Sequence, residues 1–231
     1  MSETRIEPKK QRNFKNLNLR FSIRMSYVLP PFDTAELIDV LAKAGYIRMA
    51  PPTPPGRSQG VRFSFTGLIA RKGEVIIDVN DERGVLGAAS SSPALTIDGF
   101  NEVLQLIKNN LKADPESTAS FFELIGHLEV ETQVNPLEKI GQISEKVKLF
   151  EEFSKTIGED VSIYSLRLTP KGQIPDQTEW FDITVEPSLM HTKSAYSISV
   201  VYRSKDKTKV QKFIQEFVPT IASILNAIEN D

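Results

Sequence analysis

The chain has 231 residues, of which 40% are apolar and 25% charged, and its formal net charge is −2. This length suits one large domain or two of about 100 residues each, and the composition excludes a disordered chain. With no cysteine and two histidines, the sequence excludes disulfides, thiolate metal sites and a three-histidine metal site within one chain. No cofactor is implied.

The start of the chain is polar and lacks the apolar core of a secretory signal, and no run of about 18 apolar residues exists. We therefore expect a cytoplasmic protein with no membrane partner. Residues 1–24 hold seven basic and two acidic side chains, whereas the remainder holds 21 basic and 28 acidic ones. A basic N-terminal arm, residues 1–16, can contact phosphate or an acidic partner, or serve as a solvated tail.

The first half of the sequence alternates between strand and helix patterns. Apolar residues at every second position from residue 17 predict a half-buried strand. A short amphipathic helix follows, with Asp33 and Glu36 as an N-terminal capping pair and Gly45 as its stop. Three further strands are predicted at 61–65, 74–79 and about 85–86, and a second helix at 97–111.

The second half repeats this order after a polar break at 112–120. Alternation predicts strands at 121–132, 161–168, 180–186 and 194–203, and a helix capped by Asn135 at 136–157. A long helix at 206–229 ends the chain, and Pro219 predicts a kink or a restart within it.

The two halves therefore predict an α+β fold of two similar β-α-β-β-β-α units, residues 17–112 and 121–231, joined by a linker at 113–120. Each unit has an antiparallel sheet with helices packed on one face. The two sheets either join into one curved sheet or belong to two domains packed face to face. A polar or mixed second face is left open to water or to a partner.

This element order resembles the saddle of the TATA-binding-protein family, in which two α+β repeats share a sheet with helices on the outside. The resemblance implies a shared sheet and DNA binding. It covers element order alone, because the family's glycine- and lysine-rich strand motif is missing. The phenylalanines that wedge DNA cannot be assigned either, so no residue roles are carried over.

Two sets of strand residues are candidates for binding. Counting by two places Glu123, His127 and Glu129 on one exposed face, together with Glu131. Such a row can bind a divalent metal or act as acid and base, but one histidine among glutamates is also typical of a solvated strand face. We predict no metal site and no catalytic residue from it. Arg20 and Arg24 share the exposed face of the first strand and can contact phosphates.

The segment "APPTPPGRSQG", residues 50–60, contains four prolines in five positions. Pro52, Pro55 and Arg57 fit the PxxPxR spacing that SH3-type grooves accept. The alternative is a stiff exposed connector between the first helix and the next strand, since prolines lower the entropy cost of ordering a loop.

Three functions remain open. The first is a non-enzymatic binding or assembly protein that holds a protein partner, or a second copy of itself, on its open sheet face and basic arm. The second is a nucleic-acid-binding saddle, and the third is a small-molecule binder or enzyme with a carboxylate-lined pocket. Because the sequence carries no recognisable catalytic constellation, we favour the first.

Overall fold

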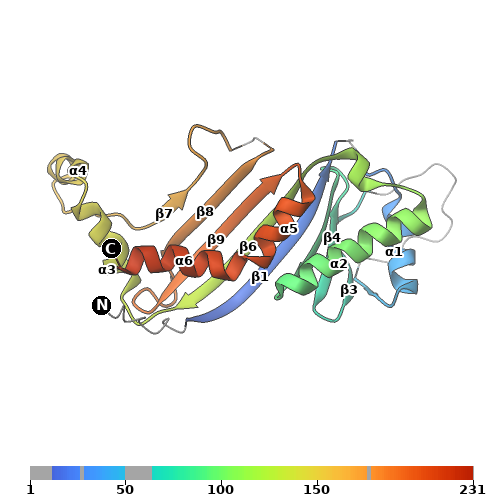
Figure 1. The fold of residues 1–231 in the computed structure, drawn as a ribbon, viewed down its shortest axis with the longest axis horizontal. Coiled ribbons are helices and arrows are strands. Elements are labelled where there is room, and N and C mark those ends of the chain that lie inside the picture. The colour runs from blue at the N-terminus through green and yellow to red at the C-terminus, as the bar shows by residue number, and fades with distance from the viewer. Residues whose placement is uncertain (1–11, 27–28, 50–63, 176–177, 231) are drawn as a thin grey trace, which may run out of the picture.

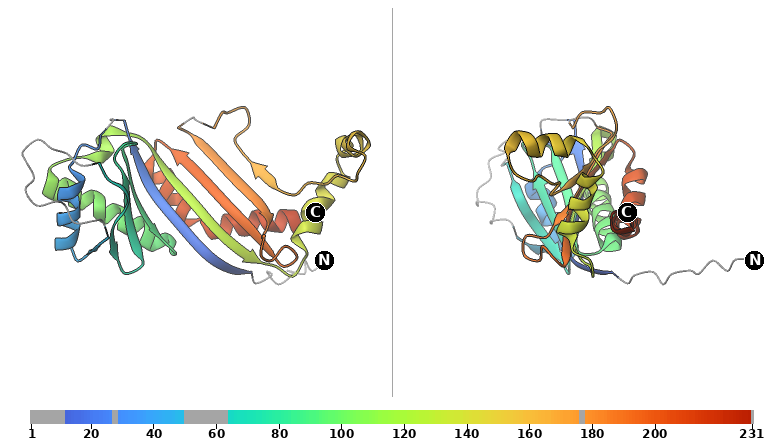
Figure 2. Two further views of the ribbon diagram at one scale, coloured as in Figure 1. Left: turned by 180° about the vertical axis from the view of Figure 1, so that it is seen from behind. Right: turned by 90° about the vertical axis from the view of Figure 1, so that its left-hand side faces the viewer.

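The computed structural model describes residues 12–26, 29–49, 64–175 and 178–230. Its centre is a single open antiparallel sheet of nine strands, in the order β2-β3-β4-β5-β1-β6-β9-β8-β7. Helices α2, α5 and α6 lie in front of this sheet in Figure 1 and behind it in the reverse view of Figure 2. The predicted α+β class with antiparallel strands is confirmed, and the strands form one sheet.

The first half of the chain supplies one end of the sheet and two of its helices. Its first helix begins where predicted, because Asp33 Oδ1 accepts hydrogen bonds from the backbone amides of Ala35 at 2.8 Å and Glu36 at 3.4 Å. Gly45 follows this helix with a φ of 88°, as a helix stop requires. The elements are β1 (Asn13–Met25), α1 (Thr34–Lys43), β2 (Ile47–Arg48), β3 (Thr66–Lys72), β4 (Val75–Asn80), β5 (Val85–Ser90) and α2 (Pro93–Leu106), followed by a π-helical turn (Ile107–Leu111) and a 3-10 turn (Pro115–Thr118).

The second half supplies the other end of the sheet. The predicted restart of the last helix is confirmed: the helix breaks at Glu216, and Pro219 lies in the first turn of its second part, where its missing amide costs no hydrogen bond. The elements are β6 (Ala119–Glu131), α3 (Pro136–Glu145), α4 (Leu149–Ile157), β7 (Leu166–Leu168), β8 (Trp180–Pro187), β9 (Ala195–Ser204), α5 (Lys207–Gln215) and α6 (Phe217–Asn230).

Most of the predicted strands differ in their bounds from those of the structure, and three of the differences are large. β1 begins at Asn13 rather than residue 17, because Asn13–Lys15 pair with Glu129–Glu131 of β6 before a bulge at Asn16. The strand predicted at 61–65 is misplaced: residues 64 and 65 are not in a strand, residues 61–63 fall outside the described residues, and the strand lies at β3, Thr66–Lys72, where it pairs with β4. β7 covers only Leu166–Leu168 of the predicted 161–168, since it pairs with three residues at the edge of the sheet.

The prediction of one helix over residues 136–157 is wrong, because the helix is interrupted after Glu145 and restarts at Leu149. The Ser144 hydroxyl donates a hydrogen bond back to the Gly141 carbonyl in the last turn before the interruption. α3 packs against β8 and α6. Beyond it, α4 projects past the end of the sheet (Figure 1).

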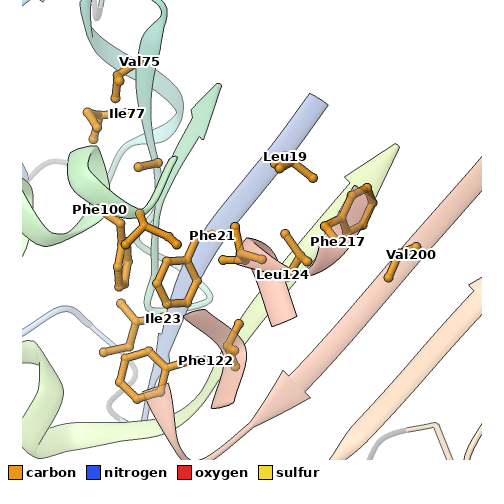
Figure 3. Close-up of a cluster of buried hydrophobic side chains, with 14 of the residues drawn as sticks. Leu19, Phe21, Ile23, Val75, Ile77, Phe100, Phe122, Leu124, Val200 and Phe217 are labelled. Carbon is orange, nitrogen blue, oxygen red and sulfur yellow. The ribbon is translucent and has the colours of Figure 1, made fainter. Parts of the chain in front are cut away.

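The core lies between the sheet and its helices. β1 and β6 pair so that Phe21 lies opposite Leu124 and Ile23 opposite Phe122. The Phe21 ring packs on Phe100 of α2, with 4.2 Å between ring centroids (Figure 3). These four side chains and Phe100 are at most 5% exposed, so the two halves share one core at the centre of the sheet.

A buried ion pair joins the start of β1 to the end of the last helix. Arg12 donates two hydrogen bonds to the Glu229 carboxylate, at 2.8 and 2.9 Å, and the two side chains are only 6% and 2% exposed. Arg12 also bonds Asn226 at 2.7 Å, and the Thr132 hydroxyl donates to Glu229 at 2.7 Å. The pair therefore fixes α6 against β1 and the end of β6.

Replacing Glu229 with alanine should destabilise the protein by about 3–5 kcal/mol, because the Arg12 guanidinium would stay buried without its counter-charge. Urea denaturation of the two proteins measures this difference in the free energy of unfolding. The matched control is Glu216→Ala, which removes an exposed contact with Lys212 at 3.9 Å and should cost less than about 0.5 kcal/mol. Equal small losses for both variants would contradict the prediction.

Candidate binding face

The sheet has a second face that carries polar side chains over most of its width. On β1, Arg20, Ser22 and Arg24 alternate with Leu19, Phe21 and Ile23, which point toward the helices. Strand pairing continues this face across β5, β6, β9 and β8. We call it the open face; its central residues are Asp78, Gly87, Ala89, Arg20, Ser22, Arg24, Glu123, Ile125, His127, Glu129, Ser199, Val201, Arg203, Asp182 and Thr184.

An arginine–aspartate pair spans three strands of the open face. Arg20 on β1 donates to both carboxylate oxygens of Asp78 on β4, with distances of 2.5 to 3.0 Å, although β5 lies between them. Strands two apart are separated by about 10 Å, so the side chains must reach over the intervening strand. Gly87 of β5 leaves that room: a Cβ there would lie 2.8 Å from Arg20 Nη2 and from Asp78 Oδ2.

Two further arginines on the open face are also bound to carboxylates. Arg203 of β9 forms an ion pair with Glu123 of β6 and lies 5.2 Å from the centroid of the Phe121 ring. Arg167 of β7 binds Asp182 of β8 through its Nε and Nη2. Among the described residues, Arg24 of β1 and Arg71 of β3 are the arginines on this side of the sheet for which no carboxylate partner is found, and Arg71 bonds the Gly73 carbonyl instead. Most of the positive charge on this face is therefore neutralised within the sheet.

The structure brings Arg20, Arg24, Glu123, His127 and Glu129 to one face, as the alternation predicts. They are neighbours on two strands rather than groups that converge on one point. His127 is exposed, and its Nδ1 lies 3.0 Å from Ser199 Oγ. Glu129 accepts a hydrogen bond from Ser188 Oγ at 2.9 Å. Their roles as ligand or partner residues stay predictions.

Other candidate features fall at the margin of the open face or outside the described residues. Glu131 accepts hydrogen bonds from Lys15 and Asn13, which lower the pKa of its carboxyl group below the ordinary value. Arg57 and the whole proline segment 50–60 lie outside the described residues, as do residues 1–11 of the basic arm. Within the described part of the chain, no three His, Asp or Glu side chains are grouped so as to hold a metal ion.

A cavity of about 360 Å³ lies beside the buried ion pair, at the end of β6. Glu131, Thr132, Ser194 and Glu229 are among its lining residues. Glu123 and Glu129 are not among the described residues that line it, so the three carboxylates of β6 do not share a pocket. Its buried carboxylate, Glu229, is already bound by Arg12 and Thr132.

Sequence reasoning placed Arg167 and Arg203 among the cations on or near the exposed strand face, but it did not single out Asp78 or Gly87 as members of it. The signal for Gly87 was a glycine inside an otherwise regular strand, which often marks a close approach of another group. The partners of Asp78 and Arg203 depend on strand order and register, and alternation within one strand gives neither.

Comparison with models of known protein families finds none that matches the chain, and comparison with curated proteins finds no match either. Within the described residues, none of the helices has the length and apolar character needed to cross a bilayer. What this chain binds must therefore be argued from the open face itself.

Replacing Gly87 with alanine should destabilise the protein by about 1–3 kcal/mol, because the new Cβ would displace the Arg20–Asp78 pair. Chemical denaturation gives the change in unfolding free energy. The control is the same substitution in a chain that already carries Arg20→Ala and Asp78→Ala. There the three side-chain atoms nearest to the added methyl group are gone, and the change should be under about 0.5 kcal/mol. The same loss in both backgrounds would show that the ion pair does not depend on Gly87.

Proposed function

We propose that the chain is a non-enzymatic binding protein that docks a protein partner on its open face. The observation that carries this proposal is the central part of the sheet, where polar and ion-paired residues surround the half-exposed Ile125, 41% exposed. Ile125 lies opposite Arg20 on β1 and Val201 on β9, and Val201 lies opposite Asp182. An apolar centre within a polar rim is the composition of protein–protein interfaces.

The ion pairs favour a protein partner over a nucleic acid. A phosphate-binding surface needs free cations, since affinity for a nucleic acid comes from replacing the counterions of its phosphates. Here Arg20 and Arg203 hold carboxylates, and their side chains are only 24% and 26% exposed. Their fixed orientation instead offers a preorganised surface, so a partner loses less side-chain entropy on binding.

The carboxylates give less support to an enzyme or small-molecule site. Glu129 and Glu131 lie about 7 Å apart along β6, and Glu123 lies about 20 Å from Glu129 on the same strand. Each is held by a different partner: Arg203, Ser188 and Lys15 respectively. A general acid–base pair needs groups that converge on one substrate atom, and these carboxylates point to separate neighbours.

We also propose that the two halves are related by internal duplication. The first strand of each half, β1 and β6, lies in the middle of the sheet, and the strand before each final helix, β5 and β9, lies next to it. α2 then packs on β1 and β5, and α5 on β6 and β9. Superposing β1, β4 and β5 on β6, β8 and β9 tests this proposal: a fit that does not carry α2 onto α5 contradicts it.

Site-specific photo-crosslinking tests the docking proposal. A benzophenone amino acid at position 125 should cross-link to a protein in cells of the source organism, because this position lies at the centre of the open face. The matched control position is 47 on β2, where the native Ile47 is 71% exposed at the end of the sheet. Substituting Ile125→Glu in a second experiment should reduce capture of the same protein at least tenfold, with an unchanged melting temperature.

Three outcomes would contradict the proposal. Equal cross-linking from positions 125 and 47 would show no preference for the open face, and undiminished capture by the Ile125→Glu variant would show that the contact is elsewhere. Binding of random-sequence DNA or RNA that falls steeply between 50 and 200 mM salt, roughly a thousandfold or more, would favour the nucleic-acid alternative.

A further inference from the structure

Helix α4 carries an apolar stripe that is largely exposed in the described part of the protein, and the ring contact of Phe153 is with Phe150 of the same helix. Leu149, Phe153 and Ile157 recur every four residues and are 49%, 42% and 64% exposed. The structure describes all of α4 and buries none of its residues. Both Figure 1 and Figure 2 show the helix outside the body of the protein. Such a stripe on a solvated helix is typical of a contact surface.

Strand β7 presents a second, partly uncovered apolar surface at the same end of the molecule: Leu166 is partly buried against the core, and the exposed part is at Leu168. Leu166 lies opposite Val185 and Leu168 opposite Ile183, so both leucines belong to the face that the helices cover. Val185 is fully buried and Ile183 is 6% exposed, but Leu168 is 42% exposed. Among the described residues, the helical layer therefore stops at β8. Tyr164, just before β7, is 44% exposed.

At the other end of the sheet, the corresponding strand is covered by a helix, which β7 is not. There α1 packs on β3, and Ile69 and Ala70 of β3 are 1% exposed. α1 buries its own stripe, Leu37, Ile38 and Leu41, in doing so. A helix with an uncovered stripe and a strand with an uncovered face thus occur together in the second half, where the first half has a helix packed on its strand.

We propose that α4 of one copy of this chain packs on β7 of a second copy, and that the partner's α4 packs on β7 of the first. Because the stripe and its receptor lie on one chain at one end, a two-fold axis creates both contacts at once. In its own chain α4 is held beyond the edge of the sheet by α3, whose Ile140 is fully buried. It can reach a second copy without leaving that position.

Charge supports this choice of partner. Glu151 and Glu152 are exposed in the first turn of α4. Near the proposed receptor, Lys171 is exposed just after β7. The helix therefore brings negative charge to a strand that an exposed lysine follows, which favours the contact.

The size of the surface predicts a weak dimer. Five half-exposed apolar side chains per copy take part: Leu149, Phe153, Ile157, Tyr164 and Leu168. At roughly 80–100 Å² each, the ten in a pair bury close to the ~1,000 Å² that a specific interface needs. We therefore expect a dissociation constant in the micromolar range.

Sedimentation equilibrium of the full chain at roughly 5 to 200 µM tests the proposal. The mass should rise from that of one chain to that of two, whereas Phe153→Glu and Leu168→Glu should each weaken the dimer at least tenfold. Ile47→Glu, an equally drastic change at the opposite end of the sheet, should leave the dimer unchanged. Circular dichroism should show all variants folded, since both substituted side chains are already half exposed.

Mixing the two weakened variants identifies the contact. In the mixture, α4 of the Leu168→Glu chain meets an intact β7 on the Phe153→Glu chain, so one of the two contacts is restored. The mixture should dimerise more strongly than either variant alone. A contact between two α4 helices would give no such recovery, because the Phe153→Glu chain brings a defective helix to every mixed pair.

A wild-type chain that stays monomeric at 200 µM would overturn the proposal, as would a Phe153→Glu variant that dimerises normally or a mixture without recovery. If α4 instead packed on β7 of its own chain, the wild-type protein would stay monomeric at 200 µM. The proposal is separate from the function of the open face: cross-linking at position 125 can succeed in a monomeric variant, and dimerisation can be intact where it fails.

Discussion

The structure depends on the antiparallel pairing of β1 with β6. Each of these strands has 13 residues, and together they form the middle of the sheet. β5 and α2 pack on β1, and β9 and α5 pack around β6, so either half is held to the other through this pairing. The paired residues are about 100 positions apart in the sequence, as Phe21 and Leu124 are. Such long-range contacts slow folding because a large loop must close before they form.

The same pairing determines how each face of the sheet is used. Side chains of neighbouring strands are crowded, so a group can lie directly over a strand only where that strand presents no side chain. On the helix side Gly126 of β6 gives this space to Phe217, whose ring atom Cε2 would lie 2.6 Å from an added Cβ. On the open face Gly87 gives it to the Arg20–Asp78 pair. One glycine therefore admits core packing and the other a polar network.

The sequence predicts those parts of the fold whose cause is local. Apolar and polar residues alternate along β6 and β9 because one face of each strand is against the helices and the other is on the open face throughout. The cap and the stop of α1 are residues directly next to the helix. The interruption after Glu145 could not be predicted, because the apolar period continues through Val147 while the supporting surface of the sheet ends. The length of β7 likewise depends on how far β8 offers a partner.

In the candidate site, too, some features can be predicted from the local sequence and others depend on the fold. Alternation alone places Arg20, Glu123 and His127 on one face. It does not show that Arg20 would bind Asp78, because this contact depends on β5 lying between β4 and β1 and on the glycine at the crossing point.

The ion pairs change which ligands the arginines of this face can bind. In the sequence, an arginine on an exposed strand suggests an unpaired positive charge that can bind a phosphate. In the folded sheet, Arg20 is held at Nε and Nη2 by one carboxylate, and its Nη1 bonds Ser22 at 3.0 Å. A phosphate would have to displace Asp78, which lies only 16% exposed and would be left unpaired. Because breaking such a pair costs more than a surface contact returns, the proposed partner of this face would use the network as it stands. The apolar surface around Ile125 is then the part of the face that can gain by being covered.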